Sequence, residues 1–150
     1  MTDLSLTLSP LTPADLPAID KLDDRAFGPG RFALTAYRLR EGVNPDPELS
    51  FVAHVGTLLV GANRMTAIKA GGAPALLLGP LTVDPPFRSR GIGEALMGKS
   101  MEAARACGLQ TAYIERPMEF GPRNPKDVSP RAANHLHARD LLDLAQQLGC

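Results

Sequence analysis

The spacing of apolar residues along the chain predicts short strands and helices that follow one another closely. Near the N-terminus, leucines alternate with serine and threonine up to Pro10, which is the period of a strand with one buried face. Residues 16–27 then form a mostly apolar stripe at helical spacing, which includes Asp23. Thr12 and Asp15 supply a capping pattern just before this stripe, so a helix is expected there.

Three strands in the middle of the chain are predicted to form an antiparallel meander, after a second short helix around residues 31–40. The strands cover residues 51–55, 58–68 and 75–83, and glycine-containing turns connect them. Strands joined by short turns pair in opposite directions.

A helix that opens at Gly93 and a fifth strand over residues 109–115 are expected next. The helix is rich in alanine, Gly108 ends it, and Met97 and Cys107 are interpreted as packing residues on it. A strand, a helix and a strand in succession favour parallel pairing, so the sheet is expected to be mixed.

The last part of the chain is predicted to form a loop followed by a helix. Residues 116–130 contain four prolines and predict a loop. Ser129 and Pro130 are then expected to begin a helix with an apolar stripe, formed by Leu141, Leu144, Ala145 and Leu148.

Length and charge narrow the class of protein. A chain of 150 residues fits a single domain over residues 1–150, and 16 basic against 16 acidic residues give no electrostatic reason to expect nucleic acid or a membrane surface as partner. Two cysteines do not make a disulfide framework, and neither a membrane span nor a signal peptide is apparent. We therefore expect a cytoplasmic protein that acts on a small molecule or a peptide.

The segment from residue 75 to residue 93 carries the clearest chemical signal. An apolar strand ends in a proline-marked turn, and the motif Arg88-Ser89-Arg90-Gly91-Ile92-Gly93 then opens a helix. Backbone N–H groups at a helix start have no partner within the helix, and glycine lets a phosphate approach them closely. The pattern predicts a pyrophosphate-binding loop.

A second motif overlaps the same helix. Residues 93–100 match the nucleotide-binding pattern Gly-x-x-x-x-Gly-Lys-Ser. A P-loop must bend directly after a strand, whereas Glu94 to Met97 are good helix formers and the strand ends well upstream, at Val83. We interpret this match as accidental.

With its motif at residues 88–93, the chain resembles the GNAT superfamily of N-acetyltransferases, whose signature is Gln/Arg-x-x-Gly-x-Gly/Ala. The resemblance covers residues 3–115 and includes the order of the predicted strands and helices. It implies an α/β fold with a GNAT-type mixed sheet of about five strands flanked by helices, followed by an atypical C-terminal loop and helix.

The resemblance also implies a reaction and a cofactor site. An acetyl group would pass from acetyl-CoA, as co-substrate and without a metal, directly to an amine acceptor. Backbone groups of Leu81, Thr82 and Val83 would pair with the pantetheine arm. The diphosphate would be held by the loop residues Arg88, Ser89, Arg90, Gly91, Ile92 and Gly93.

The catalytic acid has no matching position, because the tyrosines that the family carries after the fifth strand are absent here. Tyr113 is the remaining candidate acid, and Glu115 and His54 are weaker candidates for a base. His135 and His137, expected on a helix, would point to different faces and so do not suggest a metal site.

Residues 116–150 depart from the pattern of the family, and this difference leaves a second function open. A non-catalytic acyl-CoA-binding or oligomer-forming module would keep the loop and lose the acid and the acceptor cleft. A fifth strand left at the edge of the sheet would also favour a homodimer.

Overall fold

The computed structural model describes residues 5–33, 35–115, 123 and 136–149. The chain divides into two units, of which the first comprises Met1–Ile68 with Leu76–Ala106 and the second Lys69–Ala75 with Cys107–Cys150. Each unit is described by itself. Within the described residues, no helix is both long and apolar enough to cross a membrane.

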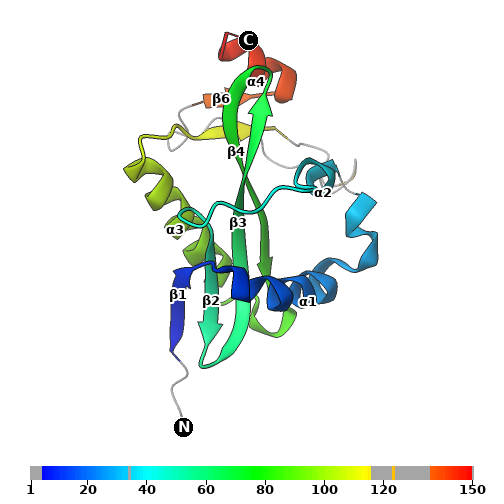
Figure 1. Cartoon of the computed structure of the whole chain (residues 1–150), viewed down its shortest axis with the longest axis vertical. Coiled ribbons are helices and arrows are strands. Elements are labelled where there is room, and N and C mark those ends of the chain that lie inside the picture. Colours follow the sequence, from blue (N-terminus) through cyan, green and yellow to red (C-terminus); the bar gives the residue numbers. More distant parts are fainter. Residues whose placement is uncertain (1–4, 34, 116–122, 124–135, 150) are drawn as a thin grey trace. The chain divides into compact units, whose positions relative to one another are not determined.

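The first unit is built on a four-stranded sheet with strand order β1-β2-β3-β4 (Figure 1). Its strands are β1 (Leu6–Pro10), β2 (Phe51–Val55), β3 (Leu58–Ala70) and β4 (Ala73–Val83), the last two of which extend into the second unit. β2 pairs antiparallel with both β1 and β3, and Figure 1 shows β4 running back along β3. The predicted meander is confirmed.

Three helices accompany this sheet. They are α1 (Leu16–Phe27), the short α2 (Thr35–Leu39) and α3 (Ile92–Ala106). Three 3-10 turns lie before or between them, namely η1 (Pro13–Asp15), η2 (Pro29–Ala33) and η3 (Pro85–Phe87). At the start of α1 the predicted capping contact is present, since the Thr12 amide donates to the Asp15 carboxylate at 2.8 Å.

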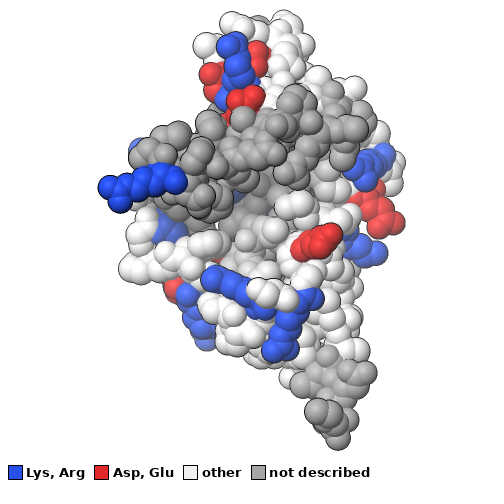
Figure 2. Space-filling view, turned by 180° about the vertical axis from the view of Figure 1, so that it is seen from behind, with Lys and Arg blue, Asp and Glu red and all other residues white. Residues whose placement is uncertain are grey.

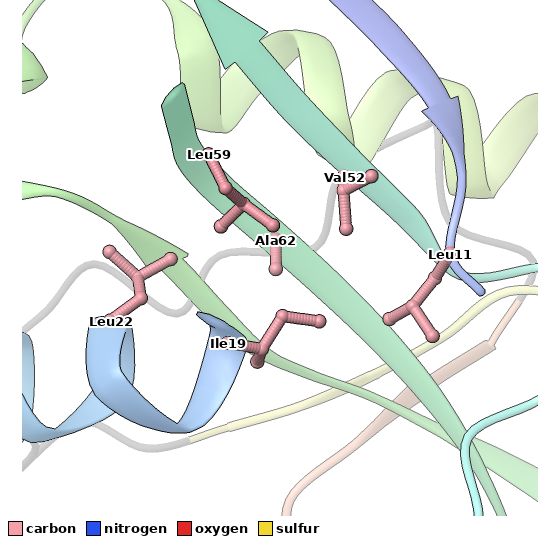
Figure 3. Packing of buried hydrophobic residues seen from close by; sticks show 6 residues of the cluster. All are labelled: Leu11, Ile19, Leu22, Val52, Leu59 and Ala62. Atoms are coloured by element: carbon pink, nitrogen blue, oxygen red, sulfur yellow. The ribbon is translucent and has the colours of Figure 1, made fainter. Parts of the chain in front are cut away.

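The two faces of the sheet have separate cores. On the α1 side, Ile19 and Leu22 of the helix pack with Val52, Leu59 and Ala62 of the strands (Figure 3). The α3 side is formed by another cluster, made of Phe51, Ala53, Val60, Ile92 and Leu96. Successive side chains of a strand point to opposite faces, which explains why neighbours such as Phe51 and Val52 belong to different clusters.

A β-bulge in β3 interrupts this alternation. Ala53 of β2 pairs with Gly61 and His54 pairs with Leu59, so Val60 is the extra residue. Val60 and Gly61 consequently both face α3, where a Cβ built on Gly61 would come within 2.9 Å of Leu96 Cδ1. The missing side chain at residue 61 allows α3 to lie close to β3.

The second unit holds a two-stranded sheet and a helix. β5 (Ala112–Ile114) pairs in parallel with β6 (Leu136–Ala138), and α4 covers Leu141–Gln147. Ala138 and Leu144 are buried here together with Ala70.

The α/β class with flanking helices is confirmed. The predicted mixed sheet of about five strands is wrong, because the described strands form a four-stranded antiparallel sheet and β5 pairs in parallel with β6 in a separate sheet. Several local predictions also need correction. A strand at 136–138 precedes α4, so His137 is not on a helix, whereas the predicted helix start at residues 129–130 lies outside the described part of the chain. Cys107 follows the end of α3 and is exposed, and Met97 is 42% exposed, because the buried stripe of α3 runs along other positions. That stripe consists of Ile92, Leu96, Ser100 and Ala104.

Candidate active site

The end of β4 presents backbone groups at an open edge of the sheet. The amide of Asp84 donates to Val60 O at 2.8 Å, so residue 84 faces β3. Because backbone groups alternate in direction along an antiparallel strand, those of Leu81 and Val83 point the other way. β4 is the last strand in the order of this sheet, as far as the described residues define it. The amides of residues 81 and 83 therefore lie on the edge that no other strand of this sheet covers.

Side chains fix this edge from both faces. Leu81 and Val83 pack against the cluster on the α3 side. Thr82 points to the α1 side, is 1% exposed, and donates from Oγ1 to Asp23 Oδ1 at 2.7 Å. Asp84 accepts a bidentate contact from Arg25 of α1, at 3.2 Å for each hydrogen bond. The strand end is thus held to α1 by two carboxylates.

The loop between β4 and α3 has positive φ angles at two of its residues. Ser89 and Gly91 adopt positive φ angles of 62° and 78°, and no atom lies within 4 Å of a Cβ built on Gly91. The first turn of α3 closes with Ala95 N donating to Gly91 O at 3.0 Å. The amides that precede Ala95 in this turn have no acceptor four residues earlier within the helix, and so they can face a ligand.

Positive charge surrounds this loop. Arg88 and Arg90 are exposed, and neither forms an ion pair with another described residue. Arg88 Nε donates to Val83 O at 3.2 Å, and the Arg90 guanidinium lies 5.3 Å from the centre of the Phe87 ring. Figure 2 shows one face of the molecule, on which Lys and Arg side chains lie together with Asp and Glu side chains. An anion at the start of α3 would meet both free amides and fixed cations.

A buried polar network lies beside the strand end. Asp23 is 2% exposed, and its carboxylate accepts from Thr82, from Tyr37 at 3.3 Å and from Arg64. Burial, followed by the negative charge of Asp23, raises the pKa of the Tyr37 phenol above its usual value. Asp23 lies in the apolar stripe predicted for residues 16–27, where no function was expected for it. An acidic residue within an apolar helix face needs buried partners, and this signal could have identified the network.

The P-loop pattern has no P-loop structure, which confirms that the match is accidental. Residues 93–100 lie within α3. The Ser100 hydroxyl is buried, donates to Leu49 O at 2.8 Å and accepts from Asn63 Nδ2 at 2.9 Å, so it is not available to a metal-bound nucleotide.

The candidate acid and bases lie on other elements. Tyr113 is half-buried in β5, and its ring centre is 5.3 Å from that of His137. Glu115 Oε1 is 2.7 Å from His137 Nε2 in the same unit, whereas His54 lies on β2 in the first unit. His135 lies outside the described residues.

The chain is similar to known proteins in family, sequence and structure. The model of the acetyltransferase (GNAT) family matches residues 16–119. The uncharacterized N-acetyltransferase YjhQ of Escherichia coli is 29% identical over 115 residues, which make up 74% of this chain. The chain spans 64% of the length of that relative.

Two solved structures show a similar fold. The GNAT family N-acetyltransferase YhbS of Escherichia coli, in complex with CoA, has a TM-score of 0.60 at 19% identity and 78% coverage of each chain. A GNAT family acetyltransferase of Brucella melitensis, in complex with acetyl-CoA, has a TM-score of 0.55 at 23% identity, with 72% of this chain and 73% of that chain covered.

Proposed function

The chain belongs to the GNAT acetyltransferase family, and we propose that it moves an acetyl group from acetyl-CoA directly to a primary amine of a small molecule or peptide. The observation that carries this proposal is the glycine loop that joins the open edge of β4 to the start of α3. The solved structures with the same fold hold CoA or acetyl-CoA, which supports the choice of co-substrate.

The residues of the loop suit a diphosphate. The free amides at the start of α3 would donate to its oxygens, while Arg88 and Arg90 would add positive charge. The amide of Val83 and the carbonyl of Leu81, on the open edge of β4, would pair with the amide groups of the pantetheine arm. In this arrangement the thioester lies near the end of β4.

The transfer needs few protein groups. The amine nitrogen attacks the thioester carbonyl carbon, the carbon–sulfur bond breaks, and the sulfur leaves as a thiolate. The amine loses one proton and the thiolate gains one. The Leu81 amide faces the same open edge, farther from the loop than Val83, and would donate to the carbonyl oxygen as negative charge develops on it. Holding both reactants in one place supplies a large part of the rate.

Proton transfer to the thiolate is assigned to Tyr113, which the sequence leaves as the candidate acid. Its phenol is half-buried, and the nearby His137 contacts Glu115. A base acting through water would complete the proton balance.

The alternative is an acyl-CoA-binding module without activity. It is favoured by one observation, namely that every feature of the proposed cofactor site lies in the first unit whereas Tyr113 lies in the second. Binding is common to both functions, and turnover separates them.

Calorimetric titration of the full chain with acetyl-CoA, and with ATP and magnesium in a parallel cell, tests the site. We expect micromolar binding of acetyl-CoA and no heat from ATP. Release of the CoA thiol in the presence of a panel of primary amines then tests catalysis. Binding without thiol release would favour the non-catalytic module, and the absence of acetyl-CoA binding would overturn both.

A further inference from the structure

A pocket of about 330 Å³ lies in the first unit, beside α1, η2, α2 and β3. Two aromatic rings and two exposed acidic side chains contribute to its lining, together with four arginines, which are Arg31, Arg38, Arg40 and Arg64. Its volume is that of a small-molecule site.

The deeper part of the pocket is cationic. Arg31 is 5% exposed and its guanidinium is held by Asp24 and by Gly28 O, while Arg64 is held by Asp23. The Nε atoms of Arg31, Arg40 and Arg64 are buried and have no hydrogen-bond partner among the described residues. Three arginines thus retain unused donor capacity at one site.

Of these three arginines, Arg40 carries the least compensated charge. It forms no ion pair with any other described residue. Burial, followed by the positive charge of Arg64, lowers its pKa. Asp20 and Glu41, the acids of the pocket, are exposed and make no ion pair with these arginines in the part of the chain that is described. An anion between Arg40 and Arg64 would relieve their mutual repulsion.

The pocket also offers an apolar surface. The Arg31 guanidinium stacks on Phe32 at 4.1 Å from the ring centre, and the Tyr37 ring packs edge-to-face on the same ring at 6.0 Å. Phe32 remains 64% exposed, so one part of its surface is free to cover the carbon skeleton of a ligand.

Two contacts connect this pocket with the strand that forms the proposed thioester site. The carboxylate of Asp23 accepts from Arg64 and Tyr37 of the pocket and from Thr82 of β4. The Arg40 guanidinium lies beside β4, since a Cβ built on Gly79 would be 3.2 Å from its Nη2. Residues that line the pocket are therefore in contact with β4 or share a partner with it.

We propose that this pocket binds the carboxylate of the acceptor, so that the substrates are amines that carry a carboxylate, such as an amino acid or the end of a peptide. Guanidinium groups match the planar carboxylate with paired hydrogen bonds. The exposed carboxylates of Asp20 and Glu41 do not repel the ammonium group of a zwitterion. This inference rests on the proposed acetyl transfer for its functional meaning, although the binding that it predicts can be measured alone.

Pairs of amines that differ by one carboxylate test the proposal, namely L-lysine with cadaverine and L-phenylalanine with phenethylamine. In calorimetry on the full chain, we expect the amino acids to bind at least about tenfold more tightly than their decarboxylated partners. In the thiol-release assay the same preference should appear in KM. Arg40→Gln should abolish the preference and Arg40→Lys should restore part of it, whereas Arg105→Gln, an exposed site on α3, should have no effect.

The two proposals fail in different ways. Selective binding of the amino acids that is lost in Arg40→Gln, without any thiol release, would support the pocket and count against the reaction. Equal binding within each pair, or no binding by either amino acid, would overturn the pocket whatever the turnover. β-Alanine and phosphoethanolamine separate the two kinds of anion, and tighter binding of the phosphate would overturn the assignment to a carboxylate.

Discussion

The hydroxyl of Thr82 donates to the buried carboxylate of Asp23 at 2.7 Å, which connects the end of β4 with the middle of α1. Both side chains are almost fully buried. The contact joins the strand that carries the proposed cofactor edge to the helix that borders the arginine-lined pocket, so its loss should affect stability and activity together.

Thr82→Val keeps the shape of this side chain and removes the donor. We expect it to lower the free energy of unfolding by about 1–3 kcal/mol, because a buried carboxylate loses one of its hydrogen bonds. Urea unfolding measures this change, with Thr82→Ser as the control that keeps the hydroxyl. In an Asp23→Leu background, which removes the acceptor, the cost of Thr82→Val should fall, and an equal cost in both backgrounds would show that the contact contributes nothing.

Gly91→Val should weaken acetyl-CoA binding by roughly tenfold or more, because φ at this position is 78° and a β-branched residue strains such a backbone by about 1–3 kcal/mol. Gly98→Ala is the matched control, since this glycine lies within α3 with open space around it. That control should raise stability by about 0.5–1 kcal/mol and leave calorimetric binding unchanged. Equal affinities for the two variants would argue against the loop as the binding site.

Gly61→Ala should destabilise the first unit by about 1–3 kcal/mol, because the added methyl group would meet Leu96 Cδ1 at 2.9 Å and Thr82 O at 3.2 Å. Thermal unfolding measures the effect, again with Gly98→Ala for comparison. A second change, Leu96→Ala, removes the overlap on the α3 side. If the two substitutions together cost as much as the sum of their separate costs, the close approach of α3 to β3 is not the cause.

Tyr113→Phe should lower kcat by about 10²–10⁴-fold and leave acetyl-CoA affinity unchanged, if its hydroxyl delivers the proton to the leaving thiolate. Single-turnover thiol release separates this step from product release. An unaltered kcat in Tyr113→Phe would remove Tyr113 from the mechanism.

The phenol of Tyr37 should titrate above its ordinary value of 10.0, because burial and the Asp23 carboxylate both disfavour the phenolate. A folded-state pKa above the unfolded value means that the neutral phenol stabilises the fold below pH 10 and that this contribution is lost as the pH rises through the folded-state pKa. Absorbance of the phenolate in the Tyr113→Phe chain isolates Tyr37, because the protein has two tyrosines. A midpoint at or below 10.0 would contradict the buried contact.

The sequence was informative where a single local pattern decides the structure. Alternating leucines, the meander turns and the motif at residues 88–93 each depend on neighbours in the chain, and each corresponds to an observed element. The same holds for the accidental P-loop, since the helix-forming residues 94–97 exclude the required bend.

Long-range contacts explain what the sequence did not predict. Asp23, Arg64 and Thr82 are far apart in the chain, and no spacing indicates that one carboxylate joins them. Cys107 fitted an apolar stripe by periodicity, but α3 ends one residue earlier and leaves the thiol exposed. In the second unit, the parallel pairing of β6 with β5 depends on residues more than twenty positions apart.

The bulge at Val60 determines which groups meet across the sheet. With strict alternation beyond Val60, Asn63 would face α1 and Arg64 would face α3. Asn63 would then lie away from Ser100, and Arg64 away from Asp23. One additional residue therefore decides which face of the sheet each later residue of β3 occupies, and the pairing of Arg64 with the buried charge of Asp23 depends on it.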